Sequence, residues 1–394
     1  KINNMENVIP RYKRPLTSIS DPVNKVEHWN LAIDAFDEKD FKKSLIEVIN
    51  YMNPKLLEGK NTDGDIEIVQ MQGSAEIHVK ITDKIFSVKA PFLKITEQTN
   101  KVALLRKVAE VNFTPLSLAQ IQLENDELWF EYEMPIELSQ PHKVYDILRN
   151  VSVYADDYDD MFIEKYNAAF YKEPKFTPLT ASEKEEVWQQ ITMVFEDYKN
   201  YTQFFKDKRW DDFQWDNLAI SMLKISNMPY VHGKLRSDLI EYIGNLFNSD
   251  LDFNFRVDKC VNFMKKLTEK PREEIMKNVY HAEQFISLRW RSSAQIITDR
   301  LKNNLERVQQ YEKEESDFNL SYYLQFNLLK LIYDYNLEDH YKTAIEDVLE
   351  EVAGLCPTDA APKLTKVFHG LQSGSIDNQN QKKESKSFFS KLFS

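Results

Sequence analysis

The stretch VALLRKVAEVNFTPLSLAQIQLENDELWFEYEM, residues 102–134, decides the fold because its hydrophobic period changes near its middle. Its first half has the three-and-four spacing of an amphipathic helix, with a stripe formed by Val102, Leu105, Val108 and Ala109. Its second half alternates apolar and polar residues on both sides of Asn125-Asp126, a pair that tolerates the positive φ of a tight turn. The stretch therefore predicts a helix followed by a β-hairpin with one buried face.

The residues on either side extend this pattern. A helical stripe over residues 24–53 predicts one helix or two short ones, and residues 65–93 alternate with a period of 2, as three antiparallel strands do. A further helix begins near Gln140-Pro141, because proline suits a first helical turn. The predicted order is α-β-β-β-α-β-β-α, which favours an antiparallel five-stranded sheet with helices on one face.

The second half of the chain has a helical period throughout, including one long helix expected over residues 272–311. No repeat of roughly 30 to 45 residues is visible, so an irregular all-α domain is expected rather than a repeat array. The predicted segments are a flexible basic arm (1–24), the α+β domain (25–170), a linker (171–181), the all-α helical domain (182–371) and a disordered tail ending in an aromatic motif (372–394).

Composition limits the partners of the protein. The net charge of −12 comprises +3 over residues 1–25, +2 over residues 371–394 and −17 between them, and so acidic a body repels nucleic acid. Two cysteines are too few for a secreted scaffold stabilised by several disulfides. No apolar run approaches the roughly 18 residues that span a bilayer. We expect a cytoplasmic protein with reduced thiols, no nucleic-acid partner and no membrane span.

The segments LLRKVAEVNFTPLSLAQIQLENDELWFEYEMPI (104–136) and HKVYDILRNVSVYADDYDDMFIEKY (142–166) carry a family resemblance. With the predicted element order, they are similar to the type III secretion chaperone-like fold, including its YbjN-type sensory-transduction branch. The resemblance covers the first 170 residues or so. It implies a small α+β domain, often a homodimer, that binds extended segments of other proteins or, in the YbjN-like branch, has a regulatory role.

The densest group of carboxylates is the cluster Asp156, Asp157, Asp159 and Asp160. A calcium-binding EF-hand loop that began at Asp156 would need glycine and glutamate at the places of Met161 and Asn167. We therefore favour a solvated acidic helix segment over a cation site.

Other chemistry-bearing motifs are weak. No GxGxxG, GxxxxGK[ST] or GxSxG motif is present, and no two histidines have HxxxH or HxH spacing. His281-Ala282-Glu283 begins like a zinc deaminase signature, but its Pro-Cys-x-x-Cys partner is missing. Cys260 is interpreted as a buried thiol, and the run 289–291 as part of a mixed-charge helix face. We expect no catalytic residue, no metal and no cofactor.

Two features favour binding of other proteins. On the sheet face opposite the helices an aromatic residue stands among polar ones, in the set Trp129, Glu131, Gln120 and Gln122, although a locally packed tryptophan explains it equally well. In the tail, four apolar residues share one side of a short helix: Phe388, Phe389, Leu392 and Phe393. For the tail we favour a docking peptide, with membrane contact second and self-packing third.

These observations lead to three functional hypotheses. The first is a non-enzymatic chaperone or adaptor, for example in a secretion or injection system, that binds a client and a second partner. The second is a YbjN-like regulatory or stress-response protein that senses a ligand, which requires a pocket between the sheet and the helical domain. The third and least supported is an enzyme in the helical domain.

Overall fold

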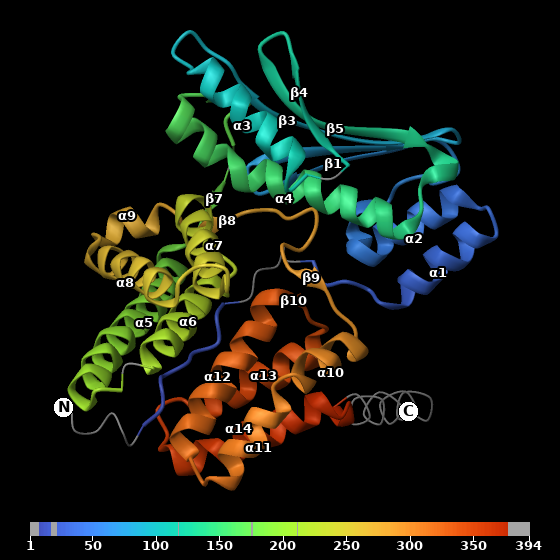
Figure 1. The fold of residues 1–394 in the computed structure, drawn as a ribbon. Helices are drawn as coiled ribbons and strands as arrows, with labels where there is room; N and C mark the ends of the chain where they lie inside the picture. Colours follow the sequence, from blue (N-terminus) through green and yellow to red (C-terminus); the bar gives the residue numbers. More distant parts are fainter. Residues whose placement is uncertain (1–7, 17–21, 117, 175, 211, 377–394) are drawn as a thin grey trace.

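The computed structural model describes residues 8–16, 22–116, 118–174, 176–210 and 212–376 of the chain. It contains an antiparallel sheet with helices, followed by a helix-rich region, as the sequence predicts (Figure 1). We call residues 27–170 the sheet part and residues 181–372 the helical part. Within the described ranges, no helix is long and apolar enough to cross a membrane.

The sheet part has six strands, one more than predicted. Its strands pair in the order β1-β2-β3-β5-β4, and the two-residue strand β6 adds to β3. Its elements are α1 (Glu27–Asp37), α2 (Phe41–Met52), η2 (Pro54–Leu57), β1 (Ile66–Gln72), β2 (Ala75–Ile81), β3 (Ile85–Lys94), α3 (Lys101–Phe113), β4 (Gln120–Glu124), β5 (Glu127–Pro135), η3 (Ile136–Leu138), α4 (Pro141–Tyr166) and β6 (Ala169–Phe170). The β4–β5 turn has positive φ at Asn125 (49°) and Asp126 (62°), which a tight hairpin requires.

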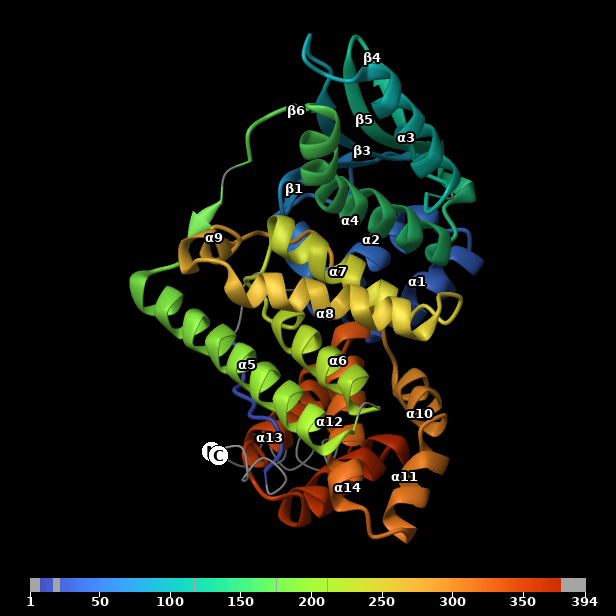
Figure 2. The same ribbon diagram turned by 60° about the vertical axis from the view of Figure 1, so that its left-hand side comes forward.

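One face of the sheet is buried against helices. In β2, Ile77, Val79 and Ile81 point into the core, and their neighbours along the strand are more exposed. Helices α1, α2 and α4 lie on the same side of the sheet (Figure 1). Helix α4 is 26 residues long, so it extends beyond the sheet and its second half packs beside α7 of the helical part (Figure 2).

Helix α3 forms where predicted, but it is rotated about its axis. Leu104, Val108 and Val111 are its buried residues, whereas Val102 is 65% exposed. The helix packs against both α4 and β4, and these contacts favour the stripe through Leu104. The spacing of the apolar residues alone allows either stripe.

The helical part is a set of packed helices connected by short extended segments (Figures 1 and 2). Its elements are β7 (Thr177–Pro178), α5 (Ala181–Lys208), α6 (Phe213–Ser226), α7 (Gly233–Phe247), α8 (Phe253–Glu269), α9 (Arg272–Met276), β8 (Tyr280–His281), β9 (Trp290–Arg291), α10 (Ala294–Lys302), α11 (Leu305–Lys313), α12 (Asp317–Asp334), β10 (Tyr335–Asn336), α13 (Asp339–Glu351) and α14 (Pro357–Gln372). Its large core is separate from that of the sheet part.

The predicted helix over residues 272–311 is wrong. It is divided into α9, α10 and α11, and the chain between α9 and α10 crosses to the sheet part. There Phe285 and Ile286 are fully buried in the core of the sheet part, and the backbone N–H of Gly73 donates to the carbonyl of Glu283 at 2.8 Å. The apolar residues of this crossing segment (residues 282–291) therefore fill a neighbouring core instead of forming a helix stripe.

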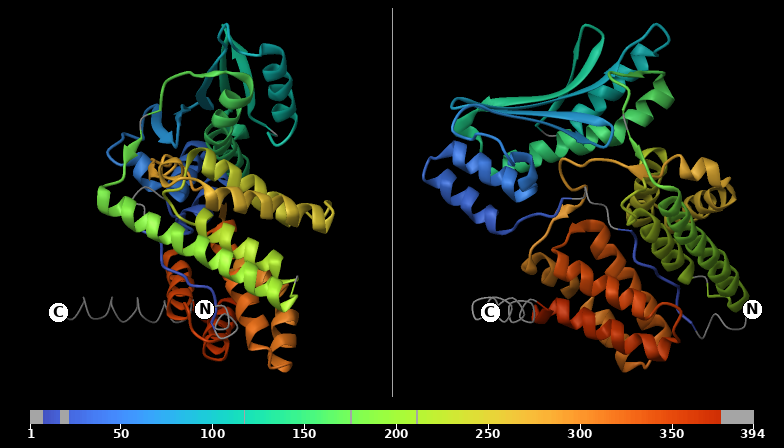
Figure 3. Two further views of the ribbon diagram at one scale, coloured as in Figure 1. Left: turned by 90° about the vertical axis from the view of Figure 1, so that its left-hand side faces the viewer. Right: turned by 180° about the vertical axis from the view of Figure 1, so that it is seen from behind.

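Residues 8–16, which we call the N-terminal segment, are held against the helical part, although the sequence predicts a flexible arm there (Figure 3). Ile9 and Tyr12 are buried in the helical core. The buried ammonium of Lys224 donates to the carbonyl of Arg11 at 2.6 Å, and the Arg11 side chain donates to Asp197 at 2.8 Å. The basic residues of this segment are thus paired with the acidic helical part.

Candidate functional site

The sheet residues predicted to bind a partner do share one face. In the β4–β5 pairing Gln120 lies opposite Glu131, and Gln122 lies opposite Trp129. The Trp129 ring packs edge-on against Tyr171, with ring centres 4.9 Å apart, so local packing accounts for this aromatic residue. Glu131 is ion-paired with Lys89 across the strands at 2.5 Å. These are the contacts of a locally packed sheet face with paired charges, so the partner surface stays a prediction.

The residues predicted as a docking motif, Phe388, Phe389, Leu392 and Phe393, lie outside the described residues. The docking interpretation therefore stays a prediction. The interpretation of Cys260 as a buried thiol is confirmed. Cys260 is buried, and its thiol donates to the carbonyl of Tyr242 at 3.3 Å.

The acidic cluster of α4 is not the solvated segment that was expected. Asp159 is 4% exposed, and Asp156 and Asp157 are also largely enclosed, because this half of α4 faces α7. The guanidinium of Arg236 on α7 donates to Asp156 at 2.8 Å and to Asp157 at 2.6 Å. Hydrogen bonds between charged groups are among the stronger ones in proteins, and here two of them join the sheet part to the helical part.

Asp156 also holds the turn between β1 and β2. The Ser74 backbone N–H donates to its Oδ1 at 2.8 Å and the Ser74 hydroxyl donates to the same atom at 3.1 Å, while that hydroxyl also bonds Asp159. Gly73 has a φ of +56°, and a Cβ on it would lie 1.9 Å from Asp156 Oδ1. The approach of this turn to α4 therefore requires glycine.

The surroundings change the acidity of these carboxylates. Burial raises the pKa of Asp157 to about 6, although the positive charge of Arg236 opposes the shift. Burial, together with the negative charge of Asp156, raises the pKa of Asp159 well above its usual range. Asp157 can consequently gain or lose a proton close to neutral pH, which the sequence did not indicate.

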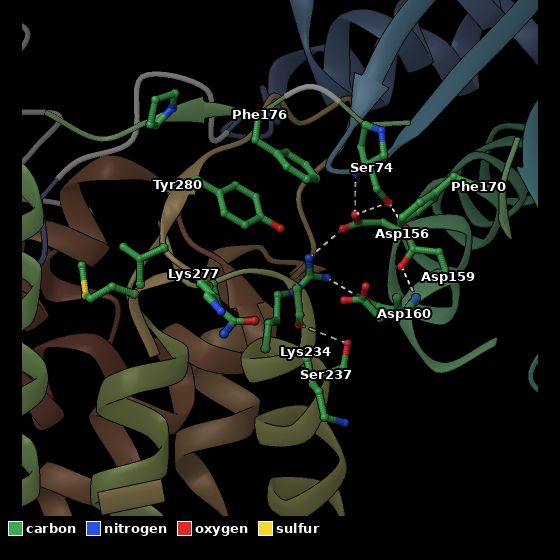
Figure 4. A pocket seen from close by; sticks show the side chains of 18 of the residues that line it. Ser74, Asp156, Asp159, Asp160, Phe170, Phe176, Lys234, Ser237, Lys277 and Tyr280 are labelled. Atoms are coloured by element: carbon green, nitrogen blue, oxygen red, sulfur yellow. Dashed lines mark hydrogen bonds and ion pairs between the residues drawn. The ribbon is translucent and has the colours of Figure 1, made fainter. Parts of the chain in front are cut away.

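A cleft of about 620 Å³ opens beside this ion pair, and we call it the junction cleft. Its walls come from α4, the β1–β2 turn, the start of α7, the described residues of 170–174 and 176–178, and residues 276–280, which run from the end of α9 to β8 (Figure 4). Phe176 and Tyr280 stack in its wall with ring centres 4.1 Å apart. Lys234, Ser237 and Asn278 add polar groups to the lining. The cleft thus offers an aromatic surface and both signs of charge to a small polar molecule.

Three of the four carboxylates that line the cleft are engaged by protein side chains, and the fourth is Asp160. Asp156 and Asp157 bond Arg236, and Asp159 bonds Ser74. In the part of the chain that the structure describes, no group of three or more His, Cys, Asp or Glu side chains is arranged to hold a metal ion. A ligand in the cleft would therefore meet the Asp160 carboxylate and the hydroxyl, amide and ammonium groups of the lining, of which Lys234 is also paired with Glu164 and Asp238.

Part of this site had a signal in the sequence. Asp156, Asp159 and Asp160 are spaced by three and four, so they share a helix face. Arg236 lies about 80 residues away on a separate helix, and nothing in its local sequence pairs it with α4. Sequence reasoning therefore found the carboxylates but missed their partner and their burial.

No protein-family model matches the chain, and a search of curated proteins finds no match.

Proposed function

We propose that this chain is a ligand-sensing regulatory protein, in which a small polar molecule bound in the junction cleft sets how firmly the sheet part and the helical part hold together. The observation that carries the proposal is the position of the cleft. Both parts supply its walls, and it lies directly against the Arg236–Asp156–Asp157 ion pair that joins them. A ligand there contacts the groups that determine the relative position of the two parts.

The physical basis is differential binding. A ligand shifts a conformational equilibrium only by the difference between its affinities for the two states. A cleft built from both parts exists only while the parts are joined, so its ligand stabilises the joined state. The pattern similar to YbjN-type sensory-transduction proteins supports the same kind of role.

A thermal-shift screen tests this proposal. The full chain is mixed with nucleotides, amino acids, sugar phosphates and dicarboxylates, and at least one compound should raise its melting temperature. Ser237→Phe, which places a ring at the cleft wall, should abolish that rise. The matched control is Gly244→Phe on the same helix, where an added Cβ meets no atom within 4 Å.

The response should also be localised. Bound ligand should slow amide hydrogen exchange in residues 73–75 and 276–280, which line the cleft or lie next to its lining residues. A compound set that leaves the melting temperature unchanged, or protects only the outer sheet face, would contradict a sensing role for the junction cleft.

The adaptor hypothesis stays a second prediction, resting on the resemblance to secretion chaperones and on the tail. Affinity capture from cells, followed by mass spectrometry, should compare the full chain with a chain ending at Gly370. Loss of one specific partner on truncation would support a cytoplasmic adaptor that docks through Phe388, Phe389, Leu392 and Phe393. An identical set of partners for both chains would contradict the docking motif.

A further inference from the structure

A second cavity of about 320 Å³, which we call the inner cavity, lies on the other side of the Arg236–Asp157 ion pair. Both of these residues line it, as they line the junction cleft. The remaining walls come from α4, residues 226–232, the crossing segment and the end of α12. His232 in the inner cavity stacks on Tyr280 of the junction cleft with ring centres 4.9 Å apart, so a thin wall separates the two spaces.

Arg149 on α4 is the unusual residue of the inner cavity. It is 6% exposed, and its Nη2 donates to the carbonyl of Leu288 at 3.0 Å. Its Nε is buried without a hydrogen-bond partner, and among the described residues it has no carboxylate within ion-pair distance. A buried charge without a directly bonded counter-charge is costly, so an arginine in this state is suited to bind an anion from outside.

The carboxylates that act on Arg149 through their charge are Asp157 and the exposed Asp146, and neither is within ion-pair distance of it. The two carboxylates that line the inner cavity are paired with other residues: Asp157 bonds Arg236, and Asp334 bonds Lys330. The guanidinium of Arg149 instead lies 3.6 Å from the centre of the Trp290 ring, which holds it in one orientation. Arg149 is therefore fixed in position with unused donor capacity.

Gln284, from the crossing segment, provides an independent indication of a ligand. It is 9% exposed and lines the same cavity, and its side-chain oxygen is buried without a partner. Buried amide oxygens nearly always accept a hydrogen bond in folded proteins. A donor on a bound molecule would satisfy this oxygen.

We propose that the inner cavity binds a small organic anion, a carboxylate or a phosphate, whose oxygens contact Arg149 and whose hydroxyl or amino group donates to Gln284. This site is separate from the junction cleft and goes beyond the sensing role proposed for it. His232 is 4% exposed, and its burial next to Arg236 lowers its pKa to about 4. The imidazole is accordingly neutral at pH 7 and adds no second charge for the anion.

The test is a titration of the full chain with sodium phosphate, L-malate and AMP, with sodium chloride holding the ionic strength constant. At least one of the three anions should bind to the wild type at least tenfold more tightly than it binds to Arg149→Gln or to Gln284→Glu. Binding of phosphate and AMP without malate identifies a phosphate site, and binding of malate alone identifies a carboxylate site. Both outcomes support the proposal.

The matched control is Arg272→Gln. Arg272 also lies over a tryptophan ring, Trp188, but it is paired with Glu185 at the surface. Its replacement should leave the affinity within twofold. If Arg149→Gln does not fold, as judged by circular dichroism, the nearly isosteric Gln284→Glu carries the comparison, because it adds a competing carboxylate to the cavity.

Equal affinities of the wild type and Gln284→Glu for all three anions, or no measurable affinity of the wild type for any of them, would overturn the proposal. Its failure is distinguishable from failure of the sensing role. An uncharged compound that protects residues 73–75 and 276–280 from hydrogen exchange, in a protein that binds none of the anions, overturns the anion site alone.

Discussion

The raised pKa of Asp157 makes a quantitative prediction about pH. Burial raises this pKa to about 6, whereas the same carboxyl in an unfolded chain titrates near its ordinary value of 3.8. The folded state therefore binds the proton more tightly, so this group stabilises the fold at low pH and the contribution disappears as the pH rises through 6. Between pH 8 and pH 5 the difference amounts to about 1.4 kcal/mol in favour of pH 5.

Asp157→Asn removes that contribution and keeps the shape of the side chain. The free energy of unfolding should be measured by urea denaturation of both proteins at several pH values between 5 and 8. The wild-type value minus the variant value should be about 1.4 kcal/mol greater at pH 5 than at pH 8. Comparing the two proteins at each pH cancels the titration of every other group that the substitution leaves unchanged.

A histidine a few residues from Arg236 provides a control of opposite sign. The pKa of His232 is lowered to about 4, so the unfolded state binds its proton more tightly and stability is lost as the pH falls below 6.5. The free energy of unfolding of His232→Gln minus that of the wild type should therefore be about 2 kcal/mol greater at pH 5 than at pH 8. Parallel pH profiles for Asp157→Asn and the wild type would refute the argument that burial governs the acidity of this site.

Three further predictions concern the same contacts. Gly73→Ala should lower the free energy of unfolding by at least ~2 kcal/mol in urea denaturation, because a left-handed backbone and displacement of Asp156 both cost energy. Lys224→Met removes the donor that holds the carbonyl of Arg11, so trypsin should cleave the N-terminal segment faster than in the wild type. Sulfate, which keeps its charge across this range, should bind the inner cavity more tightly at pH 5.5 than at pH 8, because protonation of Asp157 removes a like charge.

The sequence predicted those features that depend on local pattern. Strand alternation placed Ile77, Val79 and Ile81 in the core, and the Asn125-Asp126 turn has the backbone that such a turn requires. A hairpin is specified by residues close together in the chain, so its signal survives without tertiary information.

The predictions that failed depended on a distant partner. The period of residues 272–311 fits a helix, but Phe285 and Ile286 are drawn into the core of the sheet part. The buried stripe of α3 shares only Val108 with the predicted one, because Val102 and Leu104 fit the spacing equally and only contacts with α4 and β4 separate them. The prediction of a solvated acidic segment was wrong for the same reason, because the ion pair with the distant Arg236 allows Asp156 to be buried.

The two cavities share the Arg236–Asp157 pair, and this arrangement determines what a ligand must overcome to separate the two parts. Removing the partner of a buried carboxylate costs about 3–5 kcal/mol if the charge remains. A carboxyl with a pKa of about 6 can instead take up a proton, at a cost of about 1.4 kcal/mol at pH 7. Protonation of Asp157 therefore lowers the cost of breaking its bond to Arg236, while the bond from Arg236 to Asp156 remains. A molecule that competes for Arg236 loosens the junction, whereas a ligand that fills the junction cleft and leaves the ion pair in place stabilises it.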